Sequence, residues 1–366
     1  MAMTGAMSAA ISGLKTHMQA LSVVGNNIAN VNTNGYKAQR ITFKESVYDT
    51  LSAGSAGTNM MGSTNPKQIG YGCTVGTIDL DMSTGDLSAT GRDLDCTIRG
   101  DGFFLVGSKQ ENIDSADAVK KLQLTRVGDF QFRDGYLTDG QGNVVYGFLT
   151  SAETDAENGA GQAGTAAGEI SKDLVPIRLP MKSNKQGEEG KAVYVGVDGT
   201  TGANVNPEDG NSGYADTELD GYINYKNLRI DENGKITCNN DDTGDVVVVG
   251  YIAMGVAENP NGVLHLDGPY YEAGDAAGDI TVSAFNSAVT GALRNGKIQD
   301  GNGVDPATQL LNKSTTGLMT AFLEGSGTDL ATEFTNMILY QRGYQANTRI
   351  VTVTDTMLEE LVNMKR

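Results

Sequence analysis

Side chains that could serve as nucleophiles or general bases are sparse in this sequence. Among 366 residues there are only two histidines, His17 and His265. Nucleophilic catalysis needs a base of this kind beside a serine or cysteine, and the sequence contains no G-x-S-x-G motif. His17 falls on a predicted helix and His265 on a predicted strand or loop. Carboxylates are abundant, but no two of them are singled out as an acid and base pair. We therefore expect no catalytic residues and no enzyme activity.

The three cysteines form neither a disulfide pattern nor a metal-binding motif. Cys73, Cys96 and Cys238 are far apart, odd in number and without C-x-x-C spacing. Disulfide frameworks use even numbers of cysteines, and structural zinc sites use closely spaced ligands. We expect all three to be small packing residues.

Two short stretches are similar to ligand-binding loops but lack the residues that those loops require. A calcium loop of the EF-hand type that began at Asp79 would need glycine at its sixth position and glutamate at its twelfth. This chain has Thr84 and Thr90 there, so we predict a hairpin with solvated carboxylates. Gly100 and Gly102 lack the third glycine and the following helix of a nucleotide-binding loop, which predicts a tight β-turn instead. Neither a metal ion nor an organic cofactor is expected.

Charge and hydropathy exclude several classes of partner. The net charge is −18, and residues 151–245 alone carry 18 acidic against 8 basic residues, a net −10. This acidity argues against binding to nucleic acid or to an anionic membrane surface. No run of 18 apolar residues is present, so no transmembrane helix is predicted. Residues 1–12 carry no Lys or Arg, unlike a signal peptide. That predicts a cytoplasmic location, or export by a route that does not use such a signal.

The first element that could position functional side chains is an N-terminal helix. Its apolar residues recur at steps of four and three, as in the seam of a coiled coil. The seam comprises Met7, Ile11, Leu14, Met18, Leu21 and Ile28. The asparagine-rich stretch that follows should end the helix, because Asn caps through its side chain and, like Gly, tolerates left-handed backbone. The turn residues are Asn26, Asn27, Asn30, Asn34 and Gly35.

A second long helix is predicted from Asp329 to the end of the sequence. Asp329 is a suitable N-cap at the positive end of the helix dipole. The seam of this helix comprises Met337, Tyr340, Tyr344, Asn347, Val351, Thr354, Leu358 and Leu361. About 36 helical residues would span about 54 Å, which is more than a globular domain usually needs. We predict that both helices join subunits into a polymer; the alternative is an amphipathic helical hairpin that closes one domain.

The middle of the chain is predicted to be rich in β-structure. Residues 77–107 and 122–148 alternate apolar and polar side chains around short turns, including a turn at 84–86 and the Asp134-Gly135 and Asp139-Gly140 pairs that are typical of hairpins. Further strands are predicted at 175–179, 192–197, 221–225, 228–230 and 245–257. The result is a multi-domain α+β chain. Its parts are a helical coiled-coil polymerisation domain (1–32 plus 328–366), a linker segment (33–75), a β-rich core domain (76–150 plus 226–327) and a β-rich outer domain (151–225).

Four stretches in this order resemble the flagellar axial family of rod and hook proteins. Residues 7–40 resemble its N-terminal signature, 85–106 and 124–148 its core motifs, and 323–364 its C-terminal motif. The family usually has Ser-Asn before the last helix, where this chain reads Gly325-Ser326-Gly327-Thr328. Residues 151–225 fall where hook proteins carry a variable outer domain. Since rod proteins are typically shorter, the resemblance favours a hook protein.

The resemblance implies a structural role outside the cell. Hook proteins leave the cell through the flagellar type III export apparatus and polymerise with themselves beneath a hook cap. They form a curved, flexible tube, a universal joint between the distal rod and the hook–filament junction, which transmits motor torque to the filament. The first alternative is the distal rod, a straight driveshaft of the same family. An alternative of another class is a secreted β-rich adhesin or enzyme domain whose terminal helices trimerise.

Overall fold

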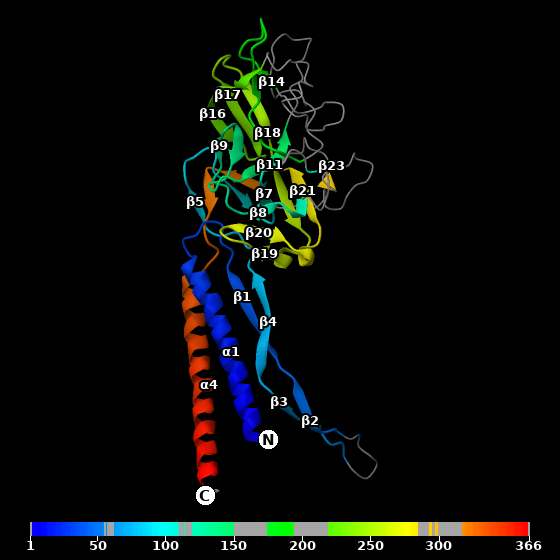
Figure 1. Ribbon diagram of the computed structural model, residues 1–366, viewed down its shortest axis with the longest axis vertical. Coiled ribbons are helices and arrows are strands. Elements are labelled where there is room, and N and C mark those ends of the chain that lie inside the picture. The colour runs from blue at the N-terminus through cyan, green and yellow to red at the C-terminus, as the bar shows by residue number, and fades with distance from the viewer. Residues whose placement is uncertain are drawn as a thin grey trace. The chain divides into compact units, whose positions relative to one another are not determined.

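The computed structural model describes residues 2–54, 56, 62–109, 113, 119–149, 174–193, 219–284, 293–294, 297–298 and 317–364 (Figure 1). The chain divides into two compact units. Unit 1 comprises Met1–Thr33, Lys37–Asp81 and Ser326–Arg366, and unit 2 comprises Asn34–Tyr36 and Met82–Gly325. Most of the predicted outer domain, 151–225, lies outside the described residues, and the predicted domain boundaries stay predictions.

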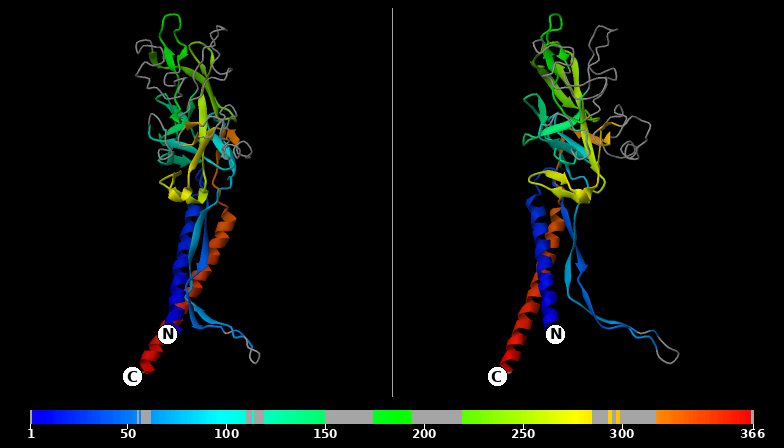
Figure 2. Two further views of the ribbon diagram at one scale, coloured as in Figure 1. Left: turned by 90° about the vertical axis from the view of Figure 1, so that its right-hand side faces the viewer. Right: turned by 45° about the vertical axis from the view of Figure 1, so that its right-hand side comes forward.

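Unit 1 contains the two predicted terminal helices, α1 (Ala2–Ala29) and α4 (Leu330–Met364). They run side by side in opposite directions, with the start of α1 and the end of α4 at the same end of the pair (Figures 1 and 2). Asp329 is the N-cap of α4, as predicted: its carboxylate accepts hydrogen bonds from the Ala331 amide (3.0 Å) and the Thr332 hydroxyl (2.6 Å). The predicted fold class, terminal helices joined to a β-rich body, is confirmed.

The asparagine-rich stretch ends α1 as its composition predicts. The Asn30 side chain donates to the Asn26 carbonyl (2.9 Å), and the Thr33 hydroxyl donates to Asn30 Oδ1 (3.1 Å). These bonds tie the residues after α1 back to its last turn. Gly35 then takes φ = +69°, a left-handed conformation that glycine adopts without steric cost.

Unit 1 also holds two strand pairs, within and just beyond the segment 33–75 that the sequence predicts to be a linker. Strand β1 (Gln39–Glu45) pairs antiparallel with β4 (Cys73–Leu80), and β2 (Tyr48–Ser52) pairs with β3 (Lys67–Gly70). The strands of each pair are separated by many residues, so no short turn signal marks them in the sequence. The hairpin predicted around Thr84 is wrong, because β4 pairs with β1 while β5 (Leu87–Ala89) pairs with β25 (Phe322–Glu324).

Unit 2 is built around a large antiparallel sheet whose central strand is β18 (Val246–Ala257), the predicted buried strand. On one edge β18 pairs first with β17 (Lys235–Asn240) and then with β21 (Ile280–Ala284). On the other edge it pairs with β11 (Val144–Leu149) and β7 (Phe103–Gly107). The remaining strands of this sheet are β8 (Gln123–Thr125), β9 (Gln131–Arg133), β10 (Tyr136–Thr138), β12 (Val175–Pro176), β16 (Tyr225–Ile230), β19 (Val263–His265), β20 (Tyr270–Ala273), β22 (Leu293–Arg294) and β23 (Lys297–Ile298).

Smaller elements complete unit 2. Strand β6 (Cys96–Arg99) pairs with β24 (Gly317–Thr320), and β13 (Met181–Ser183) pairs with β14 (Ala192–Val193) and β15 (Leu219–Tyr222). Two short 3-10 helices, η3 (Pro260–Gly262) and η4 (Asp275–Ala277), follow β18 and β20. The predicted Asp134-Gly135 hairpin is confirmed, since both residues take positive φ angles between the paired strands β9 and β10.

The core of unit 2 is formed by apolar side chains of β6, β7, β11, β17 and β18. Ile98, Phe104, Val145 and Ile252 are fully buried in it. Cys96 and Cys238 belong to the same cluster, and burial raises the pKa of the Cys238 thiol to about 11. All three cysteines are free, and Cys73 is half-buried.

Candidate functional site

The inner face of α1 is lined by small and polar residues that are buried within unit 1. These are Ala10, Gly13, Thr16, Ala20, Val23, Val24 and Asn27. A side-chain carbon added at Gly13 would lie 2.7 Å from the Asn347 amide nitrogen, so the absence of a side chain lets α4 approach closely. The Thr16 hydroxyl donates to the carbonyl of Cys73 on β4 (3.1 Å). This face of α1 is therefore used within its own chain.

The predicted seam of α1 lies on the opposite face. Met18 is 57% exposed and Ile11 is 38% exposed, while Met7, Leu14, Leu21 and Ile28 are half-buried. Residues four and three apart share one side of a helix, so these six side chains form one stripe, which we call the α1 stripe. It flanks the buried face of α1, and only Ile11 and Met18 in it are exposed.

The predicted seam of α4 is instead turned largely toward its own chain. Tyr340 packs against His17 and Phe43, with ring centroids 6.2 and 5.7 Å away. Asn347 lies against Gly13, and Thr354 is buried. Tyr344, within this seam, is exposed, and so are Leu358 and Leu361 at its C-terminal end. The two predicted seams thus differ: the α1 seam is partly exposed, at Ile11 and Met18, and most of the α4 seam packs against its own chain.

The structure reveals a second apolar stripe on α4 that the sequence analysis missed. We call it the α4 stripe; it comprises Leu339, Ala346, Ile350, Val353, Met357, Leu361 and Met364, of which only Leu361 also belongs to the predicted seam. Its members are all exposed, from 46% at Ile350 to 78% at Met364 among the larger side chains. It has the same spacing of three, four and seven residues as the predicted seam. Periodicity therefore contained the signal, but it could not say which of two stripes faces inward.

The buried asparagine Asn27 ties three elements of unit 1 together. Its amide nitrogen donates to the Gln39 carbonyl (2.8 Å) and to Glu333 Oε1 (3.0 Å), and its oxygen accepts from the Gln39 amide (3.0 Å). The end of α1 is thereby joined to the start of β1 and to the first turn of α4. A predicted turn residue is in this way the anchor of the helix pair.

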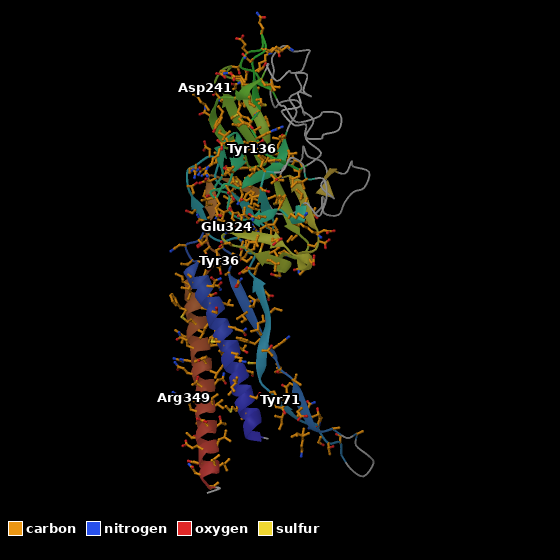
Figure 3. The ribbon with its side chains drawn as sticks, viewed as in Figure 1. Tyr36, Tyr71, Tyr136, Asp241, Glu324 and Arg349 are labelled. Atoms are coloured by element: carbon orange, nitrogen blue, oxygen red, sulfur yellow. The ribbon has the colours of Figure 1, made fainter. Side chains whose placement is uncertain are left out.

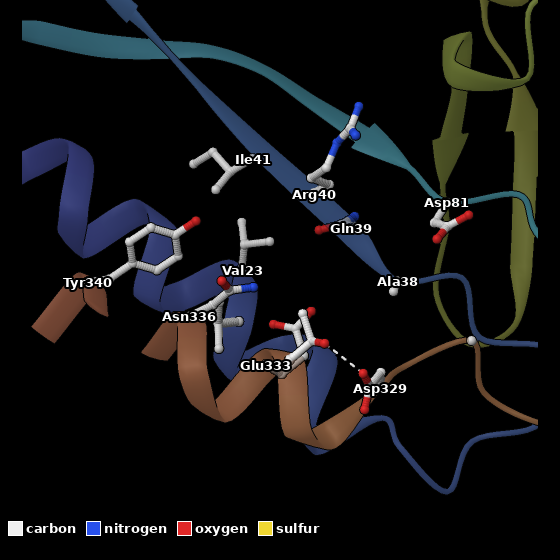
Figure 4. A pocket seen from close by; sticks show the side chains of 13 residues that line it. Val23, Ala38, Gln39, Arg40, Ile41, Asp81, Asp329, Glu333, Asn336 and Tyr340 are labelled. Atoms are coloured by element: carbon white, nitrogen blue, oxygen red, sulfur yellow. Dashed lines mark hydrogen bonds between the residues drawn. The ribbon is translucent and has the colours of Figure 1, made fainter. Parts of the chain in front are cut away.

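A pocket of about 220 Å³ lies beside this anchor, between α1, β1 and α4 (Figure 4). Val23, Ile41 and Tyr340 give it an apolar wall, and Glu333 and Asp329 line its acidic side. Burial raises the pKa of Glu333, and the hydrogen bond from Asn27 opposes this rise. The pocket combines apolar and acidic groups, without a set of side chains arranged for chemistry.

Within unit 2, the segment that follows the asparagine-rich turn is held by Glu324 (Figure 3). The Gly35 amide donates to the Glu324 carbonyl (2.8 Å), and the Gly85 amide donates to the Glu324 carboxylate (3.0 Å). The carboxylate lies 3.9 Å from the Arg126 guanidinium. Burial lowers the pKa of Arg126, and the charge of Glu324 counters this. Sequence reasoning missed this ion pair because its members are far apart in the chain.

The other predicted turn residues have structural positions. Asn26 and Asn34 are exposed, and Asn30 is half-buried at the end of α1. Gly100 and Gly102 take φ angles of +114° and +129° in the turn between β6 and β7. A side-chain carbon at Gly102 would lie 2.6 Å from the Met254 sulfur, so close packing requires glycine there.

The described residues contain no group of three or more His, Cys, Asp or Glu side chains that could hold a metal ion. No helix in the described part of the chain is long and apolar enough to cross a membrane. His17 lies in unit 1 and His265 in unit 2. The His17 ring packs in the aromatic cluster with Phe43, and the His265 ring packs edge-on against Tyr271. Neither histidine is placed beside a candidate nucleophile by these contacts.

Comparison with known proteins identifies both ends of the chain. Residues 7–37 match the family described as flagella basal body rod protein, and residues 319–364 match the family described as flagellar basal body rod FlgEFG protein C-terminal. These matches contain the whole of the α1 stripe and the whole of the α4 stripe.

Relatives align along almost the whole sequence. The flagellar basal-body rod protein FlgG of Bacillus subtilis is 32% identical over 357 residues, covering 97% of each chain. The flagellar hook protein FlgE of Borreliella burgdorferi is 26% identical, and that of Treponema pallidum is 23% identical; each alignment covers 97% of this chain and 98% of the relative. A rod-named relative thus aligns along nearly all of this chain, with a higher identity than these two hook-named relatives. These identities favour a rod protein, whereas the resemblance of the motifs favoured a hook protein.

Proposed function

Because this chain belongs to the family of flagellar basal-body rod and hook proteins, we propose that it polymerises into the axial tube of the flagellum as the subunit of the distal rod. Members of this family are structural, non-enzymatic parts of the bacterial flagellum, and they polymerise with other axial proteins. The observation that carries the proposal is the apolar surface left exposed on the two helices, namely Ile11 and Met18 of the α1 stripe and the side chains of the α4 stripe. A side chain of this size contributes roughly 1.5–3 kcal/mol to the stability of the state in which it is fully buried. Within the described chain these side chains stay in contact with water, so their burial against another molecule would stabilise an assembly.

The rod is preferred to the hook because of the degree of similarity. The rod-named relative from Bacillus subtilis is 32% identical over nearly all of both chains, against 26% and 23% for the two hook-named relatives that align as fully. The alternative of a secreted adhesin or enzyme domain has no support, since the chain belongs to a structural family and the described residues present no catalytic set.

The hook remains the second candidate, because hook-named relatives also align along 97% of this chain. In that case the neighbours of the polymer would be the distal rod, the hook–filament junction and the hook cap. With either candidate, we propose export through the flagellar type III apparatus and assembly outside the cytoplasmic membrane.

Electron microscopy of basal bodies from a strain that lacks this gene distinguishes the candidates. If the protein is the distal rod, the isolated basal bodies should end at the proximal rod and carry no hook. A complete rod without a curved hook would instead identify the protein as the hook subunit. Normal flagella would contradict both candidates. Re-expression of the chain from a plasmid should restore the missing segment and serves as the control.

A further inference from the structure

Two tyrosines of unit 2, Tyr136 and Tyr222, meet edge to face. Their ring centroids lie 6.2 Å apart, and the ring planes are inclined by 77°. Tyr136, labelled in Figure 3, belongs to β10 of the large sheet, and Tyr222 belongs to β15 of the three-stranded sheet. The contact therefore links two sheets of the same unit through residues that are far apart in the chain.

The surroundings of Tyr136 favour the loss of its phenolic proton. The Lys109 ammonium lies over the Tyr136 ring, 4.1 Å from its centroid. Burial raises the pKa of Tyr136, but hydrogen bonding by Lys109 and Tyr222 and the charge of Arg178 together bring this pKa below its ordinary value. Burial and the hydrogen bond to Tyr136 raise the pKa of Tyr222 to about 12. Since a phenolate gives up an electron more easily than a phenol does, Tyr136 is the first of the two to be oxidised.

The two rings are close and still accessible from solvent. Both Tyr136 and Tyr222 are half-buried, so each keeps an edge in contact with water. The Tyr222 ring lies directly against the turn before β10, because a side-chain carbon added at Gly135 would collide with it. Rotamers of partly exposed side chains change on the picosecond to nanosecond timescale, so side-chain rotation brings the ring edges together.

We propose that Tyr136 and Tyr222 form a site of oxidative cross-linking, at which hydrogen peroxide and a haem peroxidase join the two rings as dityrosine. Each phenol loses one electron and one proton, and the peroxide takes up both pairs and leaves as two water molecules. The two phenoxyl radicals form one carbon–carbon bond between the ring carbons next to the oxygens. The hydrogen on each bonded carbon then moves to its own phenoxyl oxygen, so the chain loses two hydrogen atoms in all.

This cross-link goes beyond the proposed function, because it forms within one chain and needs no polymer. It would act as a covalent staple between two sheets of unit 2. Like a disulfide, a bond between distant residues limits the conformations of the unfolded chain and so stabilises the folded one. Unlike a disulfide, a carbon–carbon bond is not broken by thiols. We expect the cross-linked chain to melt about 5 °C or more above the untreated chain.

Peroxidase treatment of the dilute full-length protein tests the proposal. The chain is incubated with hydrogen peroxide and a haem peroxidase, and dityrosine is followed by its fluorescence. The trypsin digest is then analysed by mass spectrometry. We expect one main joined peptide that contains Tyr136 and Tyr222 and is lighter by two hydrogen atoms than the two separate peptides. The treated chain should still migrate as a monomer on a denaturing gel, because the bond lies within it.

Three variants separate this contact from general tyrosine reactivity. Tyr222→Phe should remove the joined peptide and most of the dityrosine fluorescence. The matched control is Tyr225→Phe, since Tyr225 is 38% exposed and its ring packs against Phe132; this variant should keep the cross-link. Lys109→Met changes an exposed side chain and leaves both rings in place, so it should slow the cross-linking several-fold without unfolding the chain.

Two results would overturn the proposal. One is a digest in which Tyr136 is joined to other tyrosines as often as to Tyr222, or an unchanged dityrosine yield from Tyr222→Phe. The other is a folded wild-type chain without dityrosine under conditions that produce it in the same chain unfolded by urea. Neither result touches the axial role, which the deletion strain tests separately.

Discussion

The buried ion pair between Arg126 and Glu324 allows a quantitative test of what holds unit 2 together. Both side chains are almost fully buried, at 0% and 2% exposure. The guanidinium also donates to the Ile98 carbonyl (3.3 Å) and lies 5.4 Å from the centre of the Phe103 ring. Glu324→Gln keeps the shape of the side chain and an acceptor for the Gly85 amide but removes the negative charge. The variant therefore isolates the charge of Glu324 from its packing.

Removing one member of a buried pair typically costs about 3–5 kcal/mol, because the other charge stays buried without its partner. We expect about 3 kcal/mol for Glu324→Gln, the lower end of this range, since the charged groups are 3.9 Å apart and Asp101 also favours the charged form of Arg126. Arg126→Met should cost a similar amount. The double variant should cost no more than about 1 kcal/mol, since replacing a whole buried pair by neutral groups is often nearly neutral.

The assay is urea unfolding of the full chain, followed by the near-ultraviolet circular dichroism of its tyrosines, since the chain has no tryptophan. A double-mutant cycle of the four proteins should give a coupling free energy of about 5 kcal/mol, since the two single variants cost about 3 kcal/mol each and the double variant about 1 kcal/mol. The control is Lys226→Met, which removes the cation of an exposed ion pair with Asp241 and should change stability by less than about 1 kcal/mol. Additive effects of the two single substitutions would refute the reasoning, because the charges would then not interact.

Three further predictions concern unit 1. Asn27→Ala removes three hydrogen bonds to Gln39 and Glu333 and should destabilise unit 1 by about 2–4 kcal/mol, seen as faster amide exchange in α1 and β1. Glu333→Gln should be neutral or stabilising near pH 7. Burial raises the pKa of Glu333, so the contribution of this carboxyl to stability falls as pH rises through its folded pKa. The melting temperature of the wild type should show this fall, and that of the variant should not. Asp329→Ala should reduce helicity at the start of α4. The capping hydrogen bonds lower the pKa of Asp329, so the wild-type cap is present at neutral pH and is lost as pH falls through the folded pKa. The circular dichroism of the wild type should therefore lose helical signal in that pH range, and that of the variant should not.

Elements that are specified by residues close together in the sequence could be predicted from it. Both terminal helices, the N-cap at Asp329, the end of α1 after the asparagine-rich stretch, the Asp134-Gly135 hairpin and the long strand β18 appear where local patterns place them. Each of these signals lies within a few residues of the structure that it specifies. The hairpin predicted around Thr84 failed because its two strands pair with distant partners.

The candidate site, too, could be predicted only where its signals lie close together in the sequence. Periodicity identified a stripe on α1 that is partly exposed, and a stripe on α4 that largely packs against its own chain. It missed the α4 stripe because a helix with two apolar sides gives no sequence signal for which side is covered. That choice depends on the close approach of Gly13 to Asn347, between residues at opposite ends of the sequence.

The sequence by itself determined where the helices and the best-marked strands lie, that no catalytic set is expected, and, through four motifs in order, that the chain resembles the axial family. Only the tertiary structure decided that β1 and β4 join the helical unit, that Asn27 anchors α1 to α4, and that Arg126 meets Glu324. The physical reason is that helix periodicity and turn chemistry act between near neighbours. Burial and pairing act between residues that only the folded chain brings together.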